Sequence, residues 1–163
     1  MKRLALLALA FSFPSLAAAQ TPPPVETCGA VDAALPANLA PWRNPAPAAG
    51  AIHPGMAVQI PLRPIAELQA AVPPHQAREG GATTGARLDL EIAAPGSYEI
   101  LVDHSAWIDL VQGATALRST ARAPAMPCTT VRKIVDFSLS PGRYVIQLSG
   151  TTAANARILV VPR

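Results

Sequence analysis

An acid, an imidazole and a hydroxyl stand side by side at Asp103-His104-Ser105, and these are the three groups that a hydrolytic relay combines. Such a relay needs its side chains in line, whereas neighbours on an extended chain point to opposite faces. The sequence also lacks the G-x-S-x-G turn that presents a nucleophilic serine in one large class of hydrolases. We therefore interpret this run as a hydrogen-bonding bend between two strands and name no catalytic residue.

The same run is the only place where several kinds of metal ligand lie close in the sequence, because Asp109 follows His104 closely. The histidines His53, His75 and His104 are separated by 22 and 29 positions, and none belongs to an H-x-H or H-x-x-x-H pair. A mononuclear oxygenase needs two histidines and a carboxylate around one open position. We therefore expect no metal and no other cofactor, and predict that the three histidines do not converge. The alternative is a small metal-dependent enzyme with a site around His104.

A binding role fits the composition better than catalysis does. Functional groups are few, small apolar residues are many, and a proline-rich segment precedes the rest of the chain. Acidic residues such as Asp89, Glu91 and Glu99 sit between apolar neighbours, which is typical of the solvent face of a strand. The candidate binding residues are Asp103, His104, Trp107 and Asp109.

The two cysteines, Cys28 and Cys128, predict a disulfide, because an isolated pair in an oxidising compartment is usually oxidised. The compartment is indicated by the N-terminus. Lys2 and Arg3 precede an apolar run and a small-residue cleavage site, so residues 1–19 read as a signal peptide. We therefore expect a periplasmic or secreted protein with no transmembrane segment after cleavage.

The charge of the chain gives no argument for nucleic acid. Lysine and arginine number 13 against 10 acidic residues, and 11 basic residues remain once Lys2 and Arg3 are removed. A nearly neutral chain does not steer a polyanion to its surface. Arg132-Lys133, the only basic pair of the mature chain, is interpreted as a solvated strand edge. The partner we expect is a protein or another component of the cell envelope.

The elements that must position these residues are organised by one stretch that occurs twice. It runs as LDLEIAAPGSYEILV over 88–102 and as VDFSLSPGRYVIQLS over 135–149. Each copy has two alternating runs around a Pro-Gly pair, which predicts a β-hairpin with a type II turn that needs a positive φ at glycine. Period-two alternation then predicts a core that contains Tyr98, Ile100, Trp107, Phe137, Tyr144 and Ile146.

Short strands and turns alternate along the rest of the chain, with no long amphipathic helix. We predict an all-β fold, an antiparallel, jelly-roll-like β-sandwich of about seven or eight short strands. The domain covers 55–163, and an extended proline-rich arm covers 20–54. Trp42 is the one anchor of this arm, and we expect it to pack on the flank of the domain.

The order of motifs from Gly96 onward resembles a known family. G-x-Y-x-I-x-V, then Trp107 to Val111, then L-x-P-G-x-Y-x-I-x-L and a final strand are similar to the bacterial pre-peptidase C-terminal type of β-sandwich over roughly 88–161. That resemblance implies a secreted jelly-roll-like module with an aspartate-bearing strand between the two repeated segments.

The whole chain also resembles small exported alphaproteobacterial proteins of unassigned role, some of which carry a homogentisate 1,2-dioxygenase label. True enzymes of that name are far longer cupin proteins, and their metal-ligand cluster is not matched here. The sequence therefore predicts an exported, non-catalytic β-sandwich module with a binding or accessory role in the cell envelope.

Overall fold

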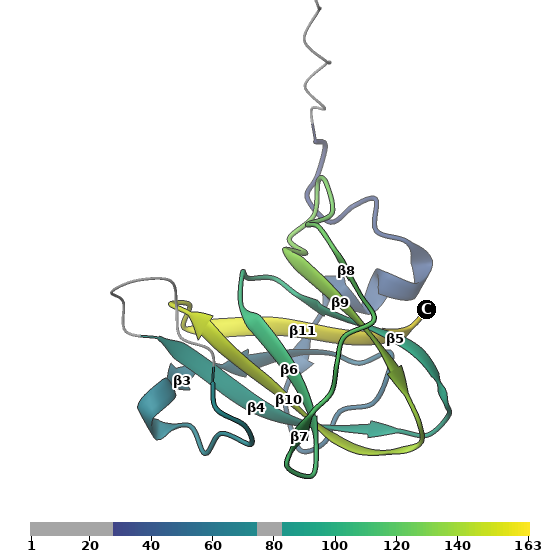
Figure 1. The fold of residues 1–163 in the computed structure, drawn as a ribbon. Helices are drawn as coiled ribbons and strands as arrows, with labels where there is room; N and C mark the ends of the chain where they lie inside the picture. Colours follow the sequence, from purple (N-terminus) through teal and green to yellow (C-terminus); the bar gives the residue numbers. More distant parts are fainter. Residues whose placement is uncertain (1–27, 75–82) are drawn as a thin grey trace, which may run out of the picture.

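The computed structural model describes residues 28–74 and 83–163. The predicted signal peptide, residues 20–27 of the arm and His75 lie outside the described residues. Two sheets stack face to face in the described part, which confirms the all-β sandwich (Figure 1). One sheet has the order β1 (Ala46–Pro47), β2 (Ala57–Pro61), β11 (Asn155–Pro162), β5 (Gly96–Val102), β9 (Lys133–Leu139), β8 (Ala121–Ala123). The other has the order β3 (Arg63–Pro64), β4 (Thr84–Ile92), β10 (Gly142–Thr151), β6 (Trp107–Gln112), β7 (Thr115–Ala116).

The two repeated segments are not hairpins, so that prediction was wrong. β4 and β5 lie in different sheets, and so do β9 and β10, so each Pro-Gly segment crosses from one sheet to the other. Neither turn is type II: Gly96 has no positive φ, and Gly142 has a φ of 157°, far from the +80° that this turn needs. Alternation is the same in a hairpin and in such a crossover, because it reports side-chain faces and not hydrogen-bond partners.

The two segments pair with each other instead: the first strand of each segment lies beside the second strand of the other. Tyr98 of β5 lies opposite Phe137 of β9, and Tyr144 of β10 lies opposite Leu90 of β4. The pairing is symmetric, because Phe137 occupies in the second segment the place that Leu90 has in the first. The register therefore relates the two segments by an approximate twofold.

Both crossovers are fastened by the same tyrosine contact. The Tyr98 hydroxyl donates to the Ala94 carbonyl and the Tyr144 hydroxyl to the Ser140 carbonyl, each over 2.8 Å. Such bonds from tyrosine to upstream backbone mark the corners of β-sandwiches. The tyrosine after each Pro-Gly pair thus has a polar role as well as a packing role.

The main core lies between the sheets and contains five of the six side chains predicted for it. These five are Tyr98, Ile100, Phe137, Tyr144 and Ile146. The exception is Trp107, which is 38% exposed. Ile108 and Leu110 are the inward residues of β6, so period two puts Trp107 on the outer face of the sheet.

A second apolar cluster covers the outer face of the six-stranded sheet. The 3-10 helix η1 (Ala37–Arg43) packs there (Figure 1). Its Trp42 is completely buried, as expected of the arm's anchor. Strand residues beneath it are apolar on both faces, because this sheet is enclosed between two layers. The cluster consists of Leu35, Leu39, Trp42, Ala57, Leu101, Val131, Ile134, Leu159 and Val161.

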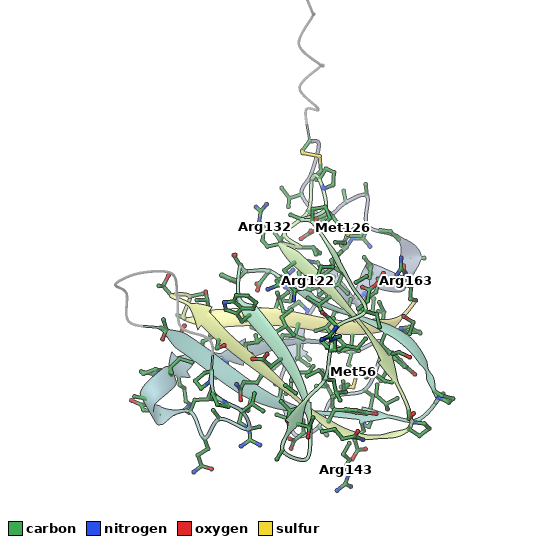
Figure 2. The ribbon with its side chains drawn as sticks, in the orientation of Figure 1. Met56, Arg122, Met126, Arg132, Arg143 and Arg163 are labelled. Carbon is green, nitrogen blue, oxygen red and sulfur yellow. A yellow bond between two sulfur atoms is a disulfide. The ribbon has the colours of Figure 1, made fainter. Side chains whose placement is uncertain are left out.

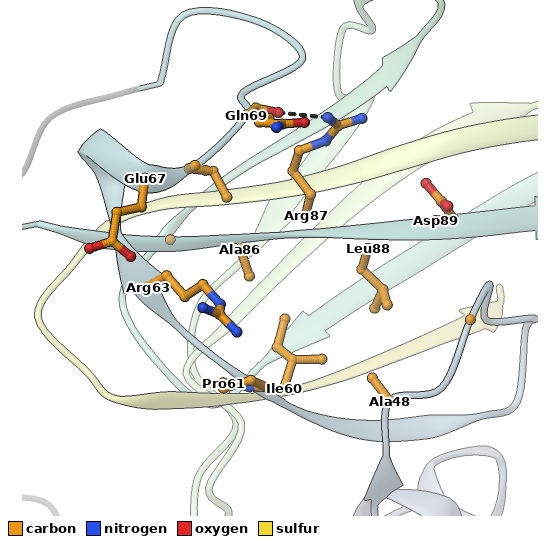
Figure 3. Close-up of a pocket in the computed structure, with 13 residues that line it drawn as sticks. Ala48, Ile60, Pro61, Arg63, Glu67, Gln69, Ala86, Arg87, Leu88 and Asp89 are labelled. Carbon is orange, nitrogen blue, oxygen red and sulfur yellow. Dashed lines mark hydrogen bonds between the residues drawn. The ribbon is translucent and has the colours of Figure 1, made fainter.

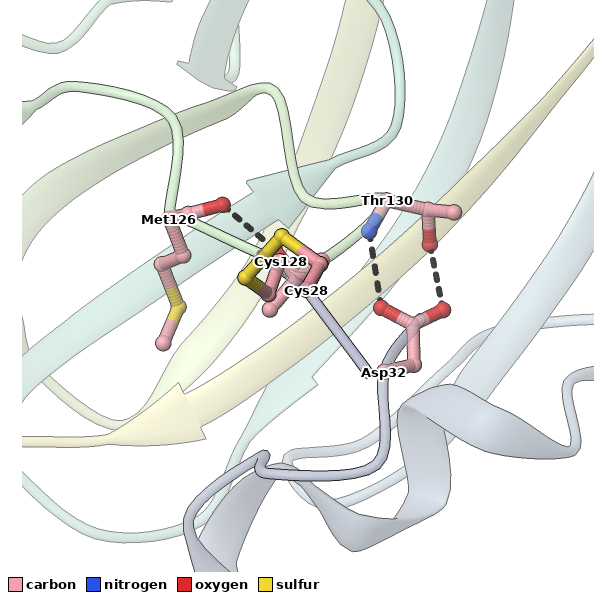
Figure 4. Close-up of a disulfide and its surroundings, with 6 residues drawn as sticks. Cys28, Asp32, Met126, Cys128 and Thr130 are labelled. Carbon is pink, nitrogen blue, oxygen red and sulfur yellow. Dashed lines mark hydrogen bonds between the residues drawn. A yellow bond between two sulfur atoms is a disulfide. The ribbon is translucent and has the colours of Figure 1, made fainter. Parts of the chain in front are cut away.

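The predicted disulfide is present and lies beside the start of this cover (Figure 4). Cys28 and Cys128 have their Cα atoms 5.2 Å apart. Close by, the Asp32 carboxylate accepts hydrogen bonds from the Thr130 amide and hydroxyl, both over 2.7 Å. The arm is therefore tied to the β8–β9 loop by a covalent bond and by a two-oxygen contact.

The outer face of the five-stranded sheet has a polar cover. The segment that follows the short helix η2 (Ile65–Glu67) in the sequence passes over Gln147 of β10 at residues 71–72. The Gln147 side chain is completely buried. The Gln147 amide accepts from the Ala71 N–H over 2.8 Å and donates to the Val72 carbonyl over 3.0 Å. Side-chain hydrogen bonds thus hold this segment on its sheet, whereas the arm is held by apolar contacts together with the disulfide and the Asp32 contact.

Candidate functional site

Asp103 and His104 form the bend between β5 and β6 that the sequence predicted. The Asp103 Oδ1 atom lies 2.6 Å from His104 Nδ1 and also accepts the Arg157 amide of β11 over 2.8 Å. One carboxylate therefore joins the bend to the neighbouring strand. The role of Asp103 here is structural, because one contact orients the His104 ring and the other holds the backbone of β11.

The histidines give no metal centre in the part of the chain that is described. Across residues 28–74 and 83–163, no three side chains among His, Cys, Asp and Glu come together as a metal site. His53 lies in the turn before β2, whereas His104 lies in the bend after β5. Because His75 is outside the described residues, the prediction that all three stay apart remains a prediction.

Trp107 contacts a lysine that the sequence analysis had placed at a solvated edge. The Lys133 Nζ atom lies 5.1 Å from the centroid of the Trp107 ring and donates to the Ala106 carbonyl over 2.5 Å. The first contact is a cation–π interaction between strands of different sheets. Lys133 is therefore half-buried and fixed, whereas Arg132 is exposed and projects from the body in Figure 2.

Lys133 is held where its charge is poorly solvated. Burial lowers the pKa of Lys133 below the ordinary 10.5, and the nearby Arg122 lowers it further, whereas Asp109 acts in the opposite direction. Asp109 thus belongs to the surroundings of Lys133 through its charge. A cation with a lowered pKa gains from any additional anion that comes close.

These groups meet at a cleft of about 540 Å³ at one end of the sandwich. It brings together the start of β6 and the bend before it, the edge strand β8, the start of β9, and the end of β10 with the turn that follows. Its lining is Ser105, Ala106, Trp107, Arg122, Lys133, Gly150, Thr151 and Thr152. Two cations, an exposed aromatic ring and hydroxyl groups can together hold an anionic group.

The predicted binding group is therefore divided by the structure. Trp107 lines the cleft and Asp109 acts on Lys133 beside it, whereas Asp103 and His104 are not among the lining residues. Arg122 and Lys133 were missed. The only available signal for them was the Arg132-Lys133 pair, and it does not show that Arg122 lies on the neighbouring strand.

Comparison with protein-family models, with curated proteins and with solved structures finds no match for this chain. Among the described residues, no helix is long and apolar enough to span a membrane.

Proposed function

We propose that this protein is an exported, non-catalytic β-sandwich that acts as a binding module of the cell envelope, in the periplasm or secreted. Its cleft beside Trp107 receives an anionic group of the partner. The observation that carries this is the meeting of Arg122 and Lys133 in one cleft next to an exposed ring. The Cys28–Cys128 disulfide supports an oxidising compartment.

Two features favour binding over turnover at this place. The lysine is already hydrogen-bonded to a carbonyl and stacked on a ring, which holds an ammonium as a fixed charge. Its lowered pKa means that an arriving carboxylate or phosphate stabilises the charged form that burial disfavours. The hydroxyl groups of Ser105 and Thr152 add donors for the same anion.

A small metal-dependent enzyme at His104 is the second candidate. The observation in its favour is the contact of Asp103 with His104 Nδ1, because metal-binding histidines use the same carboxylate contact to orient the ring. Metal analysis of protein purified from the periplasm separates the two proposals. A stoichiometric redox metal that is lost in His104→Ala overturns the binding proposal, and metal-free, folded protein supports it.

The binding proposal is tested by titrating Trp107 fluorescence and heat release with a hexaglutamate peptide and with an oligogalacturonate. These probes share carboxylates and distinguish an acidic protein segment from an acidic polysaccharide. We expect Lys133→Gln and Arg122→Gln each to weaken binding of the better probe at least tenfold. Arg132→Gln removes an equal charge outside the cleft and is the matched control. Absence of binding to both probes, or an equal loss in the control, overturns the proposal.

The pH dependence of this binding has a definite sign. Lys133 carries its charge below its lowered pKa and loses it above, so affinity for an anion should fall as pH rises through that value, before 10.5 is reached. In Lys133→Gln the fall between neutral and alkaline pH should disappear. Its persistence in that variant contradicts a role for Lys133.

A further inference from the structure

Within the described part of the chain, the edge of β4 that faces away from β10 is covered only at its ends. β3 pairs with it at Gly85 and Thr84, and Ile52 forms a single bridge at Leu90. Between these two contacts, residues 86–89 have no strand beside them in the described part of the chain. A short stretch of sheet edge is therefore open.

The contacts of Ile52 show which backbone groups point to this edge. Its N–H donates to the Asp89 carbonyl over 2.8 Å, and its carbonyl accepts from the Glu91 N–H over 2.9 Å. Because strand residues alternate in direction, Arg87 and Asp89 direct their N–H and C=O groups to the same side. Among the described residues, no hydrogen bond reaches the Arg87 N–H, the Arg87 carbonyl or the Asp89 N–H from this side.

The chain itself turns away from these groups on both flanks. Continuing the register of β3 would place Pro61 opposite Arg87, but Pro61 has no N–H and belongs to β2, where it lies opposite Asn155 in the other sheet. On the opposite flank Gly50, with a φ of 73°, turns the segment before Ile52 out of line. The open edge along residues 86–89 thus results from the course of both neighbouring segments.

A slot of about 530 Å³ lies directly along this open edge (Figure 3). Its floor is apolar and is formed by Ile60, Ala86 and Leu88, whose side chains belong to the main core. Its rim carries the side chains of Glu67 from η2 and of Arg87 from β4. The Arg87 guanidinium donates to the backbone carbonyl of Gln69, another lining residue, over 2.6 Å. An open strand edge above an apolar slot is the arrangement that binds extended peptides by strand addition.

Arg63 indicates which part of a peptide fits. Its guanidinium lies over the slot between Ala86 and Ile60 in Figure 3, and among the described residues it has no ion pair and no side-chain hydrogen bond. A peptide antiparallel to β4 runs toward Arg63, where β3 already occupies the edge at Gly85. Such a chain must end there, and its terminal carboxylate meets a guanidinium that no other described residue pairs.

We propose that this slot binds the C-terminal residues of an extended peptide of a partner protein, by antiparallel addition to β4 and capture of the terminal carboxylate by Arg63. The peptide residue opposite Arg87 exchanges both backbone hydrogen bonds with it. The residues opposite Ala86 and Leu88 turn their side chains into the slot, so an apolar C-terminal residue is preferred. The site is separate from the Trp107 cleft and does not depend on it.

The test uses fluorescence anisotropy of a labelled hexapeptide of alternating threonine and valine that ends in valine with a free carboxylate. We expect the same peptide with a C-terminal amide to bind at least tenfold more weakly, and Arg63→Gln to remove this difference. Arg132→Gln, at the other end of the molecule, should leave the affinity unchanged, and so should Lys133→Gln. The last variant distinguishes failure of this slot from failure of the Trp107 cleft.

Amide hydrogen exchange gives a second readout that does not depend on the Arg63 variant. Bound peptide should slow the exchange of the Arg87 and Asp89 amides. Equal affinity of acid and amide peptides, no binding at millimolar peptide, or protection at β8 instead overturns the proposal. Concentration-dependent dimers that Arg63→Gln abolishes also overturn it, because the occupant is then a second copy of this chain.

Discussion

Leu101 and Gln147 occupy equivalent places, each three residues after the tyrosine of its repeated segment, and both are completely buried. Leu101 lies beneath the arm and packs in the same apolar cluster as Trp42. Gln147 lies beneath residues 71–72 and is held by hydrogen bonds to their backbone. The repeated frame is therefore the same, and the segment that covers each outer face decides which side chain is stable there.

The difference shows two ways of covering a sheet with irregular chain. An apolar cover must supply side chains of its own, and the arm does so with Leu35, Leu39 and Trp42. A polar cover leaves backbone N–H and C=O groups that need partners, and one buried amide supplies them. The covalent tie occurs only on the apolar side in the described part of the chain.

The largest effect is expected from removing the disulfide, which ties down the cover of Leu101. The paired replacement Cys28→Ser with Cys128→Ser opens a loop with a sequence separation of 100 residues. Because Trp42 and Asp32 keep the arm ordered in the folded state, the loss of unfolding free energy should reach about 4 to 5 kcal/mol. Urea unfolding measures this, with reduced wild-type protein as the control. A loss below about 1 kcal/mol shows that the arm unfolds apart from the sandwich.

The next largest loss of stability is expected from truncating the two core residues that occupy equivalent places in the repeated segments. Phe137→Ala should cost roughly 3 to 5 kcal/mol, because the side chain is buried between the sheets. The equivalent change Leu90→Ala should cost about 2 to 5 kcal/mol for the same reason. Denaturant melts compare the two. A cost below about 1 kcal/mol for one of them means that the segments are not equivalent in the core.

A smaller effect separates the two covers directly. Gln147→Leu leaves the Ala71 N–H and Val72 carbonyl without their partner and should cost about 1 to 3 kcal/mol. Leu101→Met keeps the apolar contact and should cost less than about 1.5 kcal/mol. Thermal and urea unfolding of both variants give the comparison. An unchanged or increased stability of Gln147→Leu contradicts a cover held by this amide.

The smallest effect concerns the tyrosine contacts that fasten the crossovers. Tyr98→Phe and Tyr144→Phe each remove one hydroxyl bond to a carbonyl and should each cost about 0.5 to 1.5 kcal/mol. Equal losses in urea melts support the twofold relation of the segments. If one variant is neutral and the other is not, only one corner is fastened in solution.

The fold class and much of the core could be predicted from the sequence because they depend on local pattern. Alternation around Pro95-Gly96 and Pro141-Gly142 identified four strands and the inward side of each. The disulfide could be predicted equally well, since the sequence has only two cysteines that can pair. Trp107 was misplaced because its register in β6 follows Ile108 and Leu110, and a shift of one residue reverses the face.

Only the tertiary structure decided which strands share a sheet, because alternation fixes side-chain faces and leaves hydrogen-bond partners open. It alone placed Lys133 of one sheet over Trp107 of the other, and it alone brought residues 71–72 onto Gln147. Burial of that amide could not be predicted from β10, since its partners lie in a distant segment without strand pattern. The proline-rich arm shows the same limit: its composition excluded long helices, but the buried place of Trp42 depends on the apolar outer face beneath it.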